Sequence, residues 1–309
     1  MIRILSTTAL ATLIAAPATA DGLNYGRFSY DFTRYTNDDS DFELDRSVLL
    51  GGVEYELGQF LLTADIANLS FDIDDVDLST FVLGASGAYI FSPEVLAGAG
   101  LFYTSVDADD GVTEVEDDAT GFEVFGQYVN SQFGAGVNVA KADTDEDNFV
   151  TSLYGEFSAS PEITLAAIFS TDSEVDGTSY ALTAEYETGP IFVRGVYSDF
   201  TESDIGVLLL RGHYEITPQI RATAGYEVFT GDDLGDFYTL TGGAGYQITD
   251  GFWADARYGI LGGDDVSGDP YAAQLTLTYE FGERKRLDQR LGQARSDDNR
   301  FSALPALAF

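Results

Sequence analysis

The chain has 309 residues, with 15 Lys and Arg against 52 Asp and Glu, a net charge of −37 and no cysteine. Such a polyanion would be repelled by the phosphates of DNA or RNA, so nucleic-acid binding is excluded. After the first twenty residues no apolar run reaches the roughly 18 residues that a membrane-spanning helix needs; residues 81–91 form about the longest run.

The N-terminal segment has the layout of a secretory signal peptide. Arg3 supplies a basic start, residues 4–16 are apolar and small, and Ala18-Thr19-Ala20 forms an A-x-A cleavage site. The apolar run is too short for a transmembrane helix. We expect residues 1–20 to be removed on export and the folded chain to begin at Asp21.

The rest of the chain alternates between apolar and polar residues with a period of two. In the last segment Tyr271, Leu275 and Tyr279 share one face, while Gln274 and Thr276 lie on the other. The same alternation occurs around residues 180–187, 220–228 and 252–260. This period predicts β-strands with one apolar and one polar face.

Two kinds of break separate these segments in strict alternation. The short breaks contain Gly, Pro, Asn or Ser and lie at residues 58–59, 92–94, 130–132, 160–162, 188–190, 217–219 and 249–251. The longer breaks are rich in Asp and Glu and lie near residues 37–41, 71–77, 107–118, 142–148, 171–177, 200–204, 230–236 and 262–270. Alternation of short turns with longer loops is typical of antiparallel hairpins that span a bilayer.

These breaks predict an all-β fold over residues 21–282. It is a transmembrane antiparallel up-and-down β-barrel of about 16 strands, with short periplasmic turns and acidic external loops. Strand boundaries are ambiguous over residues 42–70 and 76–91, so the count lies between about 14 and 18. Such a wide barrel cannot fill its lumen with apolar side chains, so the apolar face must point towards lipid.

The pattern resembles the Gram-negative porin superfamily. Leu277-Thr278-Tyr279-Glu280-Phe281 is similar to the final strand of that family, which ends in an aromatic residue recognised by the barrel-insertion machinery. The resemblance implies the bacterial outer membrane as location, with membrane lipid and lipopolysaccharide around the barrel, and a homotrimer as assembly. Residues 283–309, which follow this strand, form a basic extension that we expect on the periplasmic side. They could form a helix, an anchor, an insertion into the lumen or a solvated tail.

In general porins the third external loop folds inward and narrows the pore. The matching stretch is residues 107–118, which is shorter than usual, so the loop could also stay outside. The acidic candidates for the constriction are Asp107, Asp109, Asp110, Glu114, Glu116, Asp117 and Asp118.

Charged residues on the polar face should line the pore. The basic candidates are Arg27, Arg194, Arg211, Arg221 and Arg257, with the phase of Arg46 ambiguous. The acidic candidates are Glu123, Glu156, Glu185, Glu187, Glu227, Asp255 and Glu280. Because acids also crowd the loops, the field should favour cations, and salt should weaken that preference.

The sequence offers little for catalysis. His213 is the single histidine, and no nearby serine stands at the spacing of a catalytic triad. We therefore expect no enzymatic activity and no cofactor, with only weak Ca²⁺ or Mg²⁺ binding at the acidic loops.

The function expected from this pattern is passive diffusion of small hydrophilic solutes and ions, with a mild preference for cations. The alternative is a closed or plugged barrel that acts as a structural or adhesive surface protein. Deleting residues 283–309 would raise the conductance of a plugged barrel and leave an open porin unchanged.

Overall fold

The computed structural model describes residues 22–37, 43–73, 76–109, 114–143, 149–173, 178–200, 205–230, 237–263, 268 and 270–282. The expected signal peptide, the extension 283–309 and Asp110 lie outside these residues. The described chain forms sixteen strands: β1 (Leu23–Thr36), β2 (Glu43–Leu57), β3 (Phe60–Ile73), β4 (Val76–Ser92), β5 (Val95–Asp109), β6 (Glu114–Val129), β7 (Phe133–Ala142), β8 (Phe149–Ser160), β9 (Ile163–Asp172), β10 (Thr178–Thr188), β11 (Ile191–Phe200), β12 (Ile205–Thr217), β13 (Ile220–Thr230), β14 (Phe237–Thr249), β15 (Phe252–Gly263) and β16 (Tyr271–Gly282).

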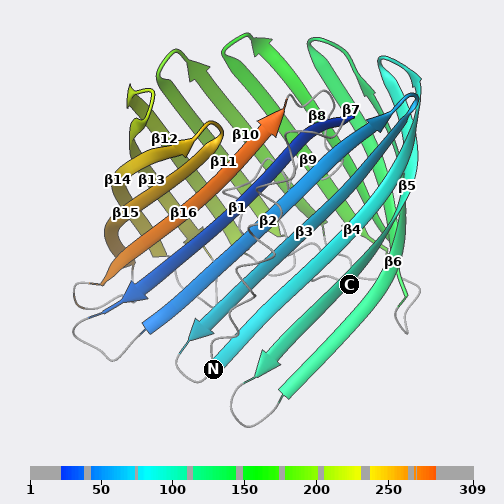
Figure 1. Cartoon of the computed structure of the whole chain (residues 1–309). Coiled ribbons are helices and arrows are strands. Elements are labelled where there is room, and N and C mark those ends of the chain that lie inside the picture. Colours follow the sequence, from blue (N-terminus) through cyan, green and yellow to red (C-terminus); the bar gives the residue numbers. More distant parts are fainter. Residues whose placement is uncertain are drawn as a thin grey trace.

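Each strand pairs with the next along the chain, and β16 pairs with β1 to close the barrel. All pairs are antiparallel, and the strands run obliquely around the wall (Figure 1). The predicted all-β up-and-down barrel of about 16 strands is therefore confirmed, with sixteen strands in the described chain. In the described part of the chain, no helix is long and apolar enough to cross a membrane.

The short breaks are tight turns that gather at one end of the barrel, which we call the turn end. Gly58 and Gly189 stand in two of them with φ of +63° and +53°, a left-handed conformation that glycine adopts without a Cβ clash. The opposite end, where β1 leads to β2, is called the loop end. Because every connection joins sequence neighbours, each strand crosses the whole height of the wall.

The faces of the barrel are inverted relative to a water-soluble β-barrel. On the outer face Leu101 and Tyr258 are 70% and 60% exposed. On the inner face Asp31 and Asp255 are only 2% and 1% exposed. A continuous exposed apolar face around a buried polar interior suits a hydrocarbon surrounding, in which polar groups must be satisfied internally.

The wall does not curve uniformly. Residues of β13 approach β15 across the intervening β14, which indicates a sharp bend there. On the opposite side, an apolar cluster of Leu61, Ala88, Leu96 and Phe125 lies on the inner face of β3–β6. The sharp bend brings the inner faces of β11–β13 towards those of β15, β16 and β1, and most of the charged inner residues lie there.

Candidate solute pathway

The polar inner wall follows directly from the strand phase. On β1 the side chains of Arg27, Ser29, Asp31 and Thr33 alternate with outward Phe28, Tyr30 and Phe32. Antiparallel register carries this phase to both neighbours: Arg27 lies opposite Glu280 of β16 and Gly52 of β2. Inward residues therefore form rows around the lumen, and each row contains directly opposed side chains that can interact.

A cavity of about 560 Å³ lies inside the bend, towards the turn end. It is lined by β1, β10–β13, β15 and β16, from Gly251 and Tyr25 near the turns up to mid-barrel. The five arginines predicted to line the pore all border it: Arg27, Arg194, Arg211, Arg221 and Arg257. Four of the predicted inward acids border it as well: Glu185, Glu187, Asp255 and Glu280. This wall is thus close to neutral in a chain of net charge −37.

Two of these arginines form close ion pairs in the wall. Arg221 donates from Nε and Nη2 to the two carboxylate oxygens of Asp255 at 2.8 and 2.5 Å, and its guanidinium lies 4.2 Å from the centre of the Trp253 ring. Arg194 donates from Nε to Glu185 Oε1 at 2.7 Å. Bidentate geometry fixes the direction of a guanidinium as well as its charge. These pairs set the shape of the cavity wall.

A glycine makes the Arg221–Asp255 pair possible. Gly245 on β14 lies between the two strands that carry the pair and pairs with both residues. A Cβ at this position would overlap the Asp255 carboxylate and would lie 2.9 Å from Arg221 Cγ. Only a residue without a side chain lets the two ions meet across an intervening strand.

Two further arginines, Arg211 and Arg257, lie beside these pairs. Arg194 and Arg211 are directly opposed on β11 and β12, an arrangement that costs free energy between like charges. A Cβ at Gly225 would lie 3.6 Å from Arg211 Cγ and 3.8 Å from Arg257 Nη1. The wall therefore concentrates positive charge at mid-barrel and balances it with acids nearer the turn end.

His213 lies in the same cavity, with its ring stacked on Phe192 at 5.1 Å between centroids. The stacking holds the imidazole against the wall. The described residues contain no group of three or more His, Asp or Glu side chains placed to hold a metal ion. Weak Ca²⁺ or Mg²⁺ binding at the acidic loops stays a prediction.

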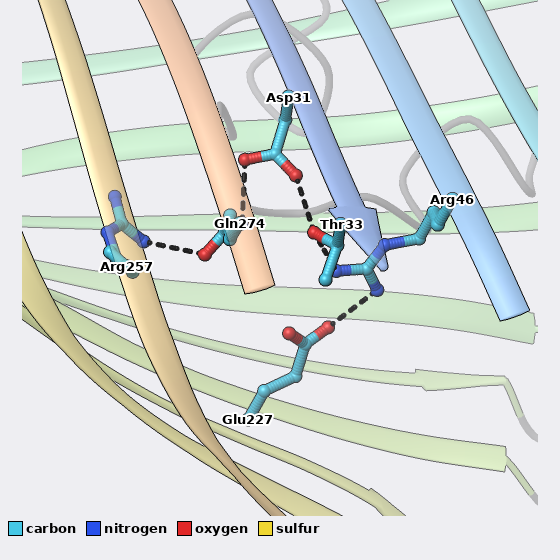
Figure 2. A network of polar contacts seen from close by, with 6 residues as sticks. All are labelled: Asp31, Thr33, Arg46, Glu227, Arg257 and Gln274. Carbon is cyan, nitrogen blue, oxygen red and sulfur yellow. Dashed lines mark hydrogen bonds and ion pairs between the residues drawn. The ribbon is translucent and has the colours of Figure 1, made fainter. Parts of the chain in front are cut away.

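A network that sequence reasoning did not find extends from the cavity towards the loop end (Figure 2). It begins at Arg257, which donates from Nη1 to Gln274 Oε1 at 3.3 Å. Gln274 Nε2 donates to Asp31 Oδ2 at 2.7 Å, and Asp31 Oδ1 accepts from Thr33 Oγ1 at 3.1 Å. Buried polar groups of this kind stabilise a wall only when each has a partner.

The network ends in an ion pair between strands β2 and β13. Arg46 of β2 donates from Nη2 to Thr33 Oγ1 at 3.5 Å and from Nη1 to Glu227 Oε1 of β13 at 3.2 Å. The phase of Arg46, ambiguous in the sequence, is inward, because it lies opposite Thr33. Glu227 had been predicted to face inward, but nothing in its spacing indicates a partner on β2.

The acidic stretch 107–118 continues the barrel wall over most of its length. Asp107 and Asp109 lie on β5, and Glu114, Glu116, Asp117 and Asp118 lie on β6. Asp107 pairs with Glu116 and Asp109 with Glu114 in regular antiparallel register. The stretch is therefore largely a hairpin, with only residues 110–113 between its strands. The part that these acids play in constricting the pore stays a prediction.

Comparison of the sequence with protein-family models and with curated proteins finds no match. Solved structures do match. Pseudomonas putida OprB covers 84% of this chain and 93% of its own, with 10% identity and a TM-score of 0.56. Acinetobacter baumannii OccAB4 covers 85% and 99%, with 8% identity and a TM-score of 0.50. Pseudomonas aeruginosa OpdQ also covers 85% and 99%, with 11% identity and a TM-score of 0.50.

These likenesses extend over nearly the whole described barrel and over nearly the whole of the matched chains. At 8–11% identity they establish the fold alone, a closed sixteen-stranded β-barrel. The resemblance predicted from the sequence is confirmed at the level of the fold.

Proposed function

We propose that the protein is an outer-membrane porin that lets small hydrophilic solutes and ions diffuse passively through its lumen. The observation that carries this proposal is the inverted barrel, which encloses a polar cavity of about 560 Å³. An apolar outer face has a stable surrounding only in lipid, and a wide polar interior provides hydrogen-bonding partners for water and solutes. The likeness in fold to OprB and OccAB4 supports the same location and role.

The setting in the membrane adds three partners to the proposal. The exposed apolar face would contact outer-membrane lipid and, at the loop end, lipopolysaccharide. The final strand β16 contains Tyr279-Glu280-Phe281 near its end at Gly282 and forms the closing seam with β1, where the insertion machinery would recognise it. The homotrimer implied by the family resemblance completes the proposed assembly.

The selectivity we propose is a mild preference for cations. Inward arginines occur only on β1, β2, β11–β13 and β15 among the described strands. The inner face of β3–β9 carries Asp65, Glu123 and Glu156 and no inward Lys or Arg. Since the basic wall is largely neutralised by its own acids, the net field in the lumen is set by the acidic side.

The test is single-channel recording of the refolded mature chain in a planar bilayer, with a salt gradient across it. The expected result is stable ohmic steps whose reversal potential shows a cation preference that weakens as salt rises. A barrel that refolds and remains silent would contradict open diffusion. A barrel that conducts with an anion preference would support the proposed porin function and contradict the proposed cation preference.

A further inference from the structure

The inner wall of the bend is packed differently towards its two ends. Towards the turn end it encloses a cavity of about 560 Å³. Beside Glu227, between Tyr35, Leu209 and Thr239, it leaves only a crevice of about 10 Å³. A single water needs roughly 10–15 Å³, so the side chains that line this crevice are closely packed. Arg211 borders both the cavity and the crevice.

The side chains that fill this level come from opposite sides of the bend. Arg46 lies three residues after the start of β2, and Glu227 lies three residues before the end of β13, so both are near the loop end. Strands β1, β16, β15 and β14 lie between them in the sheet, and five spacings of about 4.8 Å give roughly 24 Å of wall. The two side chains nevertheless meet at 3.2 Å with relative exposures of 2% and 8%.

This bridge is held on both sides. On the β2 side, the Arg46 guanidinium lies 5.4 Å from the centre of the Tyr35 ring and contacts Thr33. Thr33, Gln274 and Thr276 all donate to the Asp31 carboxylate. Figure 2 shows Arg257, Gln274, Asp31, Thr33 and Arg46 as one connected row, with Glu227 contacting the Arg46 end. A side chain fixed by several partners keeps its position when solutes collide with it.

We infer that the Arg46–Glu227 bridge forms the constriction that sets the size limit for solutes on this side of the lumen. The inference rests on the proposed porin function and assigns its size filter. The filter results from the curvature of the wall, because the bend brings β2 and β13 close enough for one ion pair to join them. Solutes that enter the arginine-lined cavity from the turn end meet the bridge before they reach the loop end.

The decisive variant removes both side chains at once, so that no unpaired charge is left buried. Arg46→Ser/Glu227→Ser should raise single-channel conductance roughly 1.5- to 2-fold, because the narrowest section widens. The size of polyethylene glycol that still enters the pore should rise with it. Arg46→Met/Glu227→Leu keeps the bulk and removes the charge, and should keep the native size limit.

A matched control lies on the same two strands. Arg34 of β1 and Asp45 of β2 form an ion pair on the outward-facing side near the loop end. Arg34→Ser/Asp45→Ser removes the same chemistry from the opposite face, so its conductance and size limit should stay native. Heat-modifiable migration on gels confirms that each variant has refolded.

The native chain offers a second test if the serine pair does not refold. Because the bridge lies near the loop end, polymers of intermediate size added from the turn end should enter the cavity and lower the conductance. The same polymers added from the loop end should have no effect. Equal access from both ends, or a serine pair with native conductance and size limit, would overturn the inference while leaving the porin in place. A native chain that never conducts would instead overturn the proposed function.

Discussion

Two arcs of the inner wall achieve burial by different means. The basic arc (β10–β16, β1 and β2) carries the six inward arginines of the described strands. Ion pairs or hydrogen bonds hold Arg46, Arg194, Arg221 and Arg257. The acidic arc (β3–β9) is packed by aromatic rings over inward glycines: a Cβ at Gly98 or Gly136 would strike the ring of Phe125 or Tyr154. Both arcs bury their inner faces, one through specific charge pairs and the other through shape.

This difference indicates where each arc is vulnerable. Removing one partner of a buried charge pair strongly destabilises the fold, because the other charge remains buried and uncompensated. A ring packed over a glycine depends on volume and tolerates changes of charge nearby. Substitutions of the same kind should therefore have unequal effects in the two arcs, and the following four predictions run from the largest expected effect to the smallest.

Asp255→Ala should destabilise the barrel most. It leaves the partly buried Arg221 beside Trp253 without its bidentate partner, at an expected cost of about 3–5 kcal/mol. Guanidinium unfolding in detergent micelles measures the change. Glu123→Gln in the acidic arc is the matched control, because Asn138 Nδ2, 2.9 Å away, can donate to the amide oxygen as well, and it should cost about 1 kcal/mol at most. Equal costs would erase the distinction between the arcs.

Gly245→Ala should be the next most harmful. The added Cβ would overlap the Asp255 carboxylate and press on Arg221, so the pair must open at a cost of about 1–3 kcal/mol. The control is Gly126→Ala on β6, where the nearest atoms to the new Cβ are 3.9 and 4.0 Å away. If the two variants unfold at the same denaturant concentration, the close approach at Gly245 does not contribute to the stability of the barrel.

Charge removal should shift ion selectivity in opposite directions in the two arcs. Glu156→Gln should lower the cation-to-anion permeability ratio about 2- to 3-fold, since one unit charge about 7 Å from an ion in water contributes ~0.6 kcal/mol. Arg257→Gln should raise the ratio by a similar factor. Reversal potentials under a salt gradient measure both, and shifts of the same sign would show that the lumen field is not divided in this way.

Arg34→Ala should have the smallest effect. This residue pairs with Glu43 and Asp45 on the outer face with 48% of its side chain exposed. Exposed ion pairs contribute about 0.2–1 kcal/mol at most. The unfolding midpoint should fall slightly in low salt and be native in high salt. A loss as large as that of Asp255→Ala would mean that outer-face pairs also hold the barrel together.

The acidic stretch 107–118 shows why sequence patterns misjudge strand ends. Its dense carboxylates indicate a loop, yet β5 runs to Asp109 and β6 begins at Glu114. Near the loop end both faces of a strand can be polar, so the alternation that identifies a strand inside the bilayer disappears. Backbone pairing, which extends the hairpin there, leaves no mark on side-chain polarity.

The sequence by itself determined the period-two faces, the order of short and long connections and hence the sixteen-stranded barrel. It also determined that Arg27, Arg194, Arg211, Arg221 and Arg257 share one face, because side-chain phase is a local property of each strand. Only the tertiary structure decided which inward residues meet. The Arg46–Glu227 bridge joins residues 181 positions apart, and their distance depends on how sharply the closed sheet bends between β2 and β13. That curvature is a collective result of packing and closure around the whole barrel, and no local pattern encodes it.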